Sequence, residues 1–283
     1  MDTLARMTGK VCLITGANSG IGYETSKALA KMGARVVMAC RNEAKAKQAQ
    51  QEIIIESGNP DVDLLIADMS SLDSVRSLAD TVKNKYSRLD VLINNAGIMN
   101  SVKEMSVDGY EMQYAVHQLG PFLLTHLLLD LLKASAPSRV INLSSKLHSM
   151  AKIEFDNLQA EKKFGAFKTY SMSKLAHLMF SYSLAQRLEG SGVTVNAVHP
   201  GVIGSNLGST PGLVKIFMKS PKRGAETSVF LASSPSMAKV TGKYFIDCKP
   251  ARSSKRSYDQ DVADRLWELA LEQTGLKSEK MVA

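Results

Sequence analysis

The chain has 283 residues, of which 45% are hydrophobic and 22% charged, and its formal net charge is +8. This composition suits a folded domain with a buried core, and a single α/β domain of this length is common. The sequence contains no apolar run of roughly 18 residues and no apolar leader, so we expect a cytoplasmic protein without a transmembrane segment.

The positive net charge has two interpretations. It could serve nucleic-acid or membrane binding, or it could reflect a site for an anionic cofactor together with solvated lysines. No nucleic-acid-binding motif occurs and aromatic residues make up only 6%, so we expect no nucleic-acid partner, while weak peripheral membrane contact stays open. The cysteines Cys12, Cys40 and Cys248 lie far apart and are interpreted as buried apolar residues of a reducing compartment.

Short apolar runs alternate with helical patterns along the chain, which predicts a parallel sheet covered by helices on both faces. Strands are expected at residues 10–15, 35–39, 63–67, 89–94, 139–143, 194–198 and 243–247. Helices are expected at residues 20–32, 44–57, 72–86, 113–133, 170–188, 224–232 and 259–274. Residues 147–168 and 203–222 follow no clear period, and long irregular stretches of this kind often face a substrate.

The first predicted strand runs directly into the sequence Thr-Gly-Ala-Asn-Ser-Gly-Ile-Gly at residues 15–22. Glycines let the backbone turn sharply and approach a pyrophosphate, and the helix that starts near Gly20 offers free N–H groups to it. A tight turn without a ligand is the alternative, but the strand before and the helix after favour a nucleotide. Cofactor contacts are expected in this loop at Gly16, Asn18, Ser19, Gly20, Ile21 and Gly22.

The end of the second predicted strand indicates which dinucleotide binds. An NAD site usually has Asp or Glu there to accept from the ribose 2′-hydroxyl. This chain has Cys40 instead, followed by Arg41 and Asn42. A guanidinium can bind a 2′-phosphate through two parallel hydrogen bonds, so NADP(H) is the expected cofactor, held by Arg41 and Asn42. An NAD-dependent protein in which Arg41 is a solvated loop residue is the alternative.

Two segments in the middle of the chain suggest proton-transfer chemistry. Tyr170 and Lys174 lie one helical turn apart at the start of a predicted helix, so they share a face. A phenol has a pKa of about 10, and a nearby ammonium would stabilise the phenolate and lower that pKa. Ser144 and Ser145 follow the strand predicted at 139–143, and a hydroxyl there could hydrogen-bond a substrate oxygen.

The glycine loop, the Tyr170–Lys174 pair and Ser145 together resemble the short-chain dehydrogenase/reductase superfamily over roughly residues 8–250. The long gap between Ser145 and Tyr170, and the segments Ala-Cys-Arg-Asn and Val-His-Pro-Gly at 39–42 and 198–201, are similar to its retinol-dehydrogenase-like branch. The resemblance implies one Rossmann-type α/β domain with a doubly wound, parallel, seven-stranded sheet. Its cofactor half would span about 8–135, its catalytic and substrate half about 136–250, and its C-terminal helix about 259–274.

The resemblance also implies roles for individual residues. It selects Ser145 over Ser144 for the substrate oxygen, Tyr170 as general acid/base, and Lys174 as a contact of the nicotinamide ribose. Where the family commonly has an asparagine that helps hold a proton-relay water, this chain has His117, which can bond water too. The remaining cofactor contacts that it implies are Asp68, Met69, Asn95, Ala96, Gly97, Pro200, Gly201, Ile203 and Ser205.

These features predict an NADP(H)-dependent oxidoreductase that interconverts a lipophilic, retinal- or steroid-like aldehyde or ketone and its alcohol. An NADP-binding sensor or scaffold with weak turnover is the alternative, because His117 departs from the family pattern. No histidine spacing suggests a metal site, so none is expected. Wide leucine faces on the helices predicted at 113–133 and 170–188 suggest a homodimer, as in the family.

Overall fold

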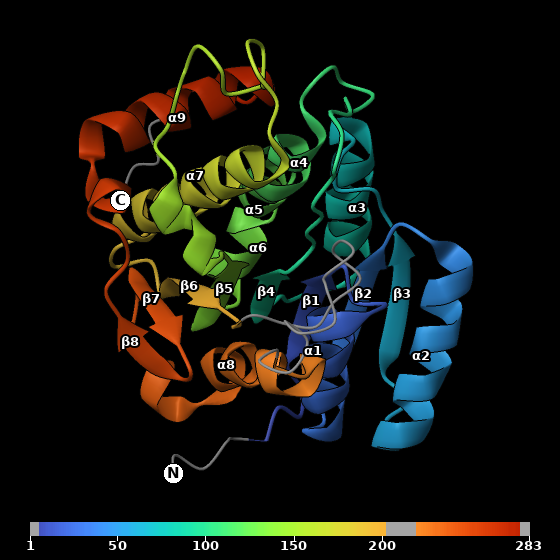
Figure 1. Cartoon of the computed structure of the whole chain (residues 1–283). Coiled ribbons are helices and arrows are strands. Elements are labelled where there is room, and N and C mark those ends of the chain that lie inside the picture. The colour runs from blue at the N-terminus through green and yellow to red at the C-terminus, as the bar shows by residue number, and fades with distance from the viewer. Residues whose placement is uncertain (1–5, 202–218, 278–283) are drawn as a thin grey trace.

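The computed structural model describes residues 6–201 and 219–277, and a single sheet organises them (Figure 1). All the strands expected from the sequence form within two residues of their predicted bounds. They are β1 (Val11–Thr15), β2 (Arg35–Cys40), β3 (Val62–Ile66), β4 (Val91–Asn94), β5 (Ser138–Leu143), β6 (Val193–His199) and β7 (Lys243–Ile246). An additional short strand, β8 (Lys249–Ala251), pairs antiparallel with β7 at one edge.

The order of the strands locates the edge at which ligands bind. The sheet reads β3-β2-β1-β4-β5-β6-β7-β8, and every pair except β7 and β8 is parallel. The chain therefore moves outward from β1 to β3, returns to β4 beside β1, and then moves outward in the other direction. In such a doubly wound sheet, ligands bind beyond the carboxyl ends of the strands where the order reverses, here between β1 and β4.

The strands are apolar throughout because both faces of the sheet are covered. In β1, Leu13 points into one hydrophobic cluster while Cys12 and Ile14 point into the other, and all three are fully buried. Cys40 is also buried and Cys248 is half-buried, and all three cysteines are free thiols. Cys12 and Cys40 thus fill the core as expected from the sequence.

The helices divide between the two faces of the sheet (Figure 1). One layer packs α1 against both α2 and α8, and the other packs α3 against α5 and contains α7. The bounds are α1 (Gly20–Lys31), α2 (Glu43–Ser57), α3 (Leu72–Lys85), α5 (Gly120–Leu127), α7 (Ala166–Arg187) and α8 (Pro221–Ser233). None of the helices among residues 6–201 and 219–277 is long and apolar enough to cross a membrane.

The helix expected at 113–133 is interrupted, which corrects the sequence prediction. It consists of α4 (Met112–Tyr114), a π-helical turn η1 (Ala115–Leu119), α5, and α6 (Leu129–Ala134). Pro121 has no N–H, and it falls where a regular α-helix would need a donor for the carbonyl of His117. The missing donor accounts for the wider π-helical turn at 115–119. Such turns are frequent at functional sites.

The last helix, α9 (Gln260–Gln273), lies outside α7 and forms a third layer on that side of the sheet (Figure 1). Its Trp267 is buried against Phe122 and Phe180, with ring centroids 5.1 and 5.9 Å away. Its end is fixed to the first half of the chain, because the hydroxyl of Tyr110 donates to the carbonyl of Gln273 at 3.0 Å. Helix α9 thus connects the two halves of the fold.

Candidate active site

The glycine loop forms the tight turn between β1 and α1. Gly16 and Gly20 have positive φ angles of 66° and 56°, which disfavour residues with a Cβ. A Cβ on Gly22 would lie 2.3 Å from the carbonyl oxygen of Gly16, so only glycine fits there. Within the described chain, the side chain of Ser19 makes no capping bond to α1, which leaves the first N–H groups of the helix for a ligand.

The segment after β4 holds this loop in place. The Thr15 hydroxyl accepts hydrogen bonds from the backbone N–H groups of Asn95 and Ala96, both at 3.0 Å. The Asn95 side chain in turn donates to the carbonyl of Thr15 at 2.7 Å. Asn95 therefore braces the loop with its amide, and Thr15 is a functional residue that the predicted set of site residues lacked, although it opens the motif.

The end of β2 presents Arg41 to solvent, since its side chain is 65% exposed. Its guanidinium lies 3.8 Å from the Asp68 carboxylate, whose other oxygen accepts from the backbone and hydroxyl of Ser70. Asn42 caps α2, and its side-chain oxygen accepts from the N–H of Lys45 at 2.9 Å. Arg41 is therefore accessible to an anion, while the Asn42 side chain is already engaged by the helix.

Tyr170 lies in the first turns of α7, beside Ser145, which follows β5 by two residues. Burial raises the pKa of Tyr170, and a hydrogen bond with the side chain of Ser145 partly offsets this rise. Lys174, one turn further along α7, has its ammonium nitrogen 5.9 Å from the centre of the Tyr170 ring. The structure thus brings these three predicted residues together at the carboxyl end of β5.

Lys174 is almost completely buried, and its Nζ donates to the carbonyl of Leu143 at 2.8 Å. Burial lowers the pKa of Lys174 to about 7. The sequence had suggested that Lys174 would lower the pKa of Tyr170, but burial is the dominant influence on that phenol. The hydroxyl of Ser144 is used within the fold, because it donates to the backbone carbonyl of Lys174 at 3.2 Å.

His117, on the π-helical turn, lies edge-on to Tyr170, with ring centroids 5.4 Å apart. Its Nε2 accepts from the backbone N–H of Ile98 at 3.0 Å, and its Nδ1 bonds the Ser173 hydroxyl at 2.8 Å. Protein groups therefore engage both ring nitrogens. The water-binding role expected for His117 does not fit this geometry. Ser173 was missed from the sequence, because a serine inside a helix carries no signal of its own.

A second histidine, His148, is hydrogen-bonded to the backbone of Ser145. His148 donates from Nδ1 to the carbonyl of Ser145 at 2.6 Å, and its Nε2 accepts from the N–H of Ser254 at 3.1 Å. His199 accepts from the N–H of Lys146 at 3.1 Å. These two histidines are hydrogen-bonded structural residues. Among the residues that the structure describes, no three His, Cys, Asp or Glu side chains cluster to hold a metal ion.

The remaining predicted cofactor contacts surround the same edge of the sheet. Met69 is buried, and a Cβ on Gly97 would lie 3.7 Å from the Nζ of Lys174. Pro200 and Gly201 follow β6, and Gly201 has a φ of 96°. The predicted contacts Ile203 and Ser205, and most of the irregular region at 203–222, lie outside the described residues.

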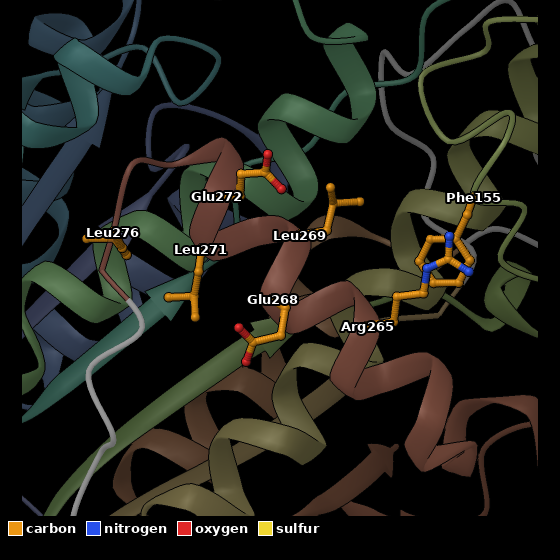
Figure 2. A pocket seen from close by; sticks show the side chains of 7 residues that line it. All are labelled: Phe155, Arg265, Glu268, Leu269, Leu271, Glu272 and Leu276. Atoms are coloured by element: carbon orange, nitrogen blue, oxygen red, sulfur yellow. The ribbon is translucent and has the colours of Figure 1, made fainter.

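A surface hollow of about 590 Å³ lies on α9 and shares no residue with the cluster around Tyr170 (Figure 2). The guanidinium of Arg265 stacks on the Phe155 ring at 3.9 Å from its centre. The residues that line this hollow are Phe155, Arg265, Glu268, Leu269, Leu271, Glu272 and Leu276. Its position on the outer helix separates it from the proposed chemistry.

Comparisons with known proteins agree with this geometry. The sequence model of the family described as short chain dehydrogenase matches residues 10–211. Human retinol dehydrogenase 14 is 44% identical, over 95% of this chain and 88% of the relative. Mouse retinol dehydrogenase 11 is 42% identical, over 96% of this chain and 88% of the relative.

Solved structures with the same architecture include a putative uncharacterized protein from Mycobacterium paratuberculosis. It is 32% identical with a TM-score of 0.81, and the match covers 98% of this chain and 97% of that one. The RhlG/NADP active-site complex of Pseudomonas aeruginosa is 25% identical with a TM-score of 0.72, and the match covers 91% of this chain and all of that one, 100%.

Proposed function

The chain belongs to the short chain dehydrogenase family, and from that premise we propose that it is an NADP(H)-dependent oxidoreductase that interconverts a lipophilic carbonyl compound and its alcohol. The retinol dehydrogenases among its relatives support action on a CH–OH group. The observation that carries the proposal is the grouping of Ser145, Tyr170 and Lys174 next to Gly97, on the segment that braces the glycine loop.

The fit of a dinucleotide rests on the shape of the loop. A Cβ atom at Gly16 or Gly22 would collide with neighbouring protein atoms, so only glycine allows this tight turn. The N-terminal turn of α1 then offers its N–H groups to a pyrophosphate. Arg41 is an exposed cation directly after β2, whose last residue is Cys40 in place of the acid of an NAD site, and its one ion pair within the described part of the chain is the long one with Asp68 at 3.8 Å. The relative solved with NADP supports the same preference.

Tyr170 is the proposed proton donor. When bound, the nicotinamide would supply the hydride for carbonyl reduction. Tyr170 would give its phenolic proton to the carbonyl oxygen, and Ser145 would donate a hydrogen bond to the same oxygen as negative charge develops there. The burial that raises the pKa of Tyr170 keeps its phenol protonated at neutral pH, which is the form required of an acid.

Apolar side chains near the site support a lipophilic substrate. Met150, at the end of the short helix after Ser145, is 75% exposed, and Phe167, one turn before Tyr170, is 66% exposed. Contiguous exposed apolar surface often marks a binding site, and these two side chains lie close in sequence to Ser145 and Tyr170. A retinal-like or steroid-like aldehyde or ketone matches both this feature and the retinol dehydrogenase relatives.

A panel of carbonyl compounds tests the proposal. Purified protein with NADPH is expected to oxidise the cofactor, seen as loss of its absorbance, in the presence of retinal or a bulky ketone. Small polar aldehydes should be poor substrates. NADPH should also bind more tightly than NADH in a direct titration. Absence of turnover with every member of the panel, despite tight NADPH binding, would contradict the proposed activity.

That outcome would favour the second candidate, an NADP-binding sensor or scaffold. The observation behind it is His117, whose ring nitrogens are both bonded to protein groups where the family commonly has an asparagine. A location in the cytoplasm, weak contact with a membrane surface and assembly as a homodimer remain further proposals from the sequence.

A further inference from the structure

We propose that His117 is a positioning residue, a neutral imidazole that ties the segment after β4 to the first turns of α7 and thereby holds Tyr170 in place. The inference rests on the proposed function, because it concerns the same site. It assigns His117 a different task from the one suggested by the sequence, which was to help hold a water that relays protons.

The hydrogen bonds around His117 are consistent with only one tautomer. The backbone N–H of Ile98 points at Nε2 at 3.0 Å, so Nε2 must be the acceptor and carries no proton. The Ser173 hydroxyl donates its single proton to the carbonyl of Tyr170 at 2.8 Å. It can therefore only accept from His117, at 2.8 Å, so the proton of the imidazole lies on Nδ1.

The surroundings of His117 also keep the ring neutral. Its side chain is buried, and the groups that face it are the amine of Lys174, the ring of His177 and the phenol of Tyr170. Burial, and then the charges of Lys174 and His177, hold the pKa of His117 well below its usual range. A second proton, on Nε2, would also face the N–H of Ile98, and two donors would repel each other.

The result is a chain of contacts from the cofactor side to the reacting phenol. The segment that contains Ile98 continues from the loop that braces the glycine turn, and Ser173 bonds the carbonyl of Tyr170 itself. The His117 ring also contacts the Tyr170 ring edge-on, at 87° between planes. Loss of this link would let Tyr170 drift, and a displacement of about 1 Å can cost on the order of a hundredfold in rate.

Ser173→Ala breaks the middle of the link and leaves His117 intact. His117→Gln breaks the same link from the other side, because its amide oxygen can replace Nε2 as the acceptor from Ile98 while the ring nitrogen at the Nδ1 position, which donates to Ser173, is lost. Each variant should lower kcat about tenfold or more, with little change in the carbonyl KM or the Kd of NADPH. The double variant should be no slower than the slower single one, because one link is lost in all three.

Two further variants separate positioning from general damage to the fold. Ser173→Thr keeps the hydroxyl, which can still bond the carbonyl one turn back, and should recover most of the lost turnover. Ser181→Ala is the matched control, because Ser181 lies on the same helix, donates to the carbonyl of His177 and accepts from Asn142. It is expected to leave kcat within about twofold of the wild type.

The pattern of these rates decides between the two roles. If His117 relayed protons, His117→Gln would be slow, Ser173→Ala would be nearly normal, and the pH profile of kcat would change shape in His117→Gln. A positioning role predicts that kcat falls to a similar extent in Ser173→Ala and His117→Gln. It also predicts that the pH profile of kcat keeps its shape at lower values. Additive losses in the double variant, or no rescue by Ser173→Thr, would overturn the proposal.

Nuclear magnetic resonance gives a test that does not require turnover. The ¹⁵N shifts of His117 in the wild-type protein should report a proton on Nδ1 and no titration between about pH 5 and 8. A signal with the proton on Nε2, or one that titrates near pH 6.5, would overturn the inference. If no carbonyl is reduced while this signature is present, the proposed function fails and the geometry assigned to His117 stands.

Discussion

Lys174 is the residue of the site whose charge is most sensitive to pH. Burial lowers the pKa of this lysine to about 7, so its ammonium loses its proton at a much lower pH than an exposed lysine does. The carbonyl of Leu143 accepts from Nζ and keeps it at that position. The positive charge beside the phenol therefore decreases as the pH rises above 7, which weakens the stabilisation of a phenolate.

Tyr170→Phe removes the proposed acid and keeps the ring that packs on His117. We expect turnover to fall by about a hundredfold or more, the usual contribution of a positioned acid, while NADPH affinity stays nearly unchanged. Steady-state rates and a fluorescence titration of NADPH would measure both. Tyr23→Phe is the control, because the Tyr23 hydroxyl bonds the exposed Glu56 and takes no part in the cluster. Wild-type turnover in Tyr170→Phe would remove Tyr170 from the mechanism.

Arg41→Asp should reverse the choice of cofactor. It removes a cation that can bind a 2′-phosphate and places a second acid beside Asp68. A loss of about 2 kcal/mol or more in NADPH binding is expected, with a gain for NADH. Arg35→Gln, at the opposite end of β2, serves as the control and should change neither affinity. Unchanged NADPH affinity in Arg41→Asp would show that another basic residue holds the phosphate.

Local sequence signals predict those site residues that have a motif of their own. The glycines, Arg41, Ser145 and the Tyr170–Lys174 pair all belong to recognisable patterns, and the structure brings Ser145, Tyr170 and Lys174 together. Ser173 and the bonding of His117 could not be predicted, because they depend on which side chains meet across two elements. Such contacts are set by packing between segments distant in sequence.

At the scale of elements, continuous apolar runs predicted the parallel strands well, because a strand covered on both faces must be apolar along its whole length. β8 was missed because three residues at a sheet edge, of which two are exposed, carry no such pattern. The interruption at residues 115–119 escapes prediction because the continuous leucine pattern on both sides of Pro121 is that of one unbroken helix. Helix α7 starts four residues before the predicted Tyr170, at Ala166.

Trp267 anchors α9 to the aromatic core beneath it. It is buried against Phe122 and His126, and the guanidinium of Arg187 lies 4.3 Å from the ring. Trp267→Ala should lower the free energy of unfolding by about 3–5 kcal/mol, because it leaves a large cavity. Urea denaturation would measure this loss. Leu269→Ala is the control, because Leu269 is only partly buried and lines the surface hollow, and it should cost roughly 1 kcal/mol. Equal losses would contradict the prediction.

At the scale of the whole molecule, buried histidines should make the fold sensitive to acid. Burial lowers the pKa of His126 and His199 to about 4, and the pKa values of His117 and His177 lie well below the usual 6.5. Between about pH 6.5 and 4 the unfolded chain therefore binds more protons than the folded chain, so stability decreases as the pH falls through this window.

The melting temperature should consequently decrease between about pH 7 and 5, as measured by circular dichroism. His126→Phe keeps an aromatic ring beside Phe122 and Trp267 and removes one ionisable group. Its melting temperature should depend less steeply on pH than that of the wild type. A variant with the same slope as the wild type would show that His126 does not contribute to acid sensitivity.

The homodimer stays a prediction, and the structure changes the argument for it. Most of the leucines that suggested an interface, among them Leu123, Leu128 and Leu178, are buried inside the chain, Leu127 and Leu131 are partly buried, and α9 packs on α7. A dimer on this side of the molecule would therefore bury the outer face of α9 or the partly exposed Leu127 and Leu131. Light scattering at micromolar concentration should report twice the chain mass. A single species of 30.7 kDa would contradict the prediction.

The position of α9 also affects how the protein folds during its synthesis. The ribosome makes this helix after every element that it covers, and domains generally begin to fold from the N-terminal side as they emerge. Until residues 260–276 leave the ribosome, the aromatic rings of Phe122 and Phe180 have no Trp267 to pack against, and Tyr110 has no Gln273 carbonyl to bond. Until α9 packs in place, the apolar surface around these two rings therefore stays uncovered in the nascent chain.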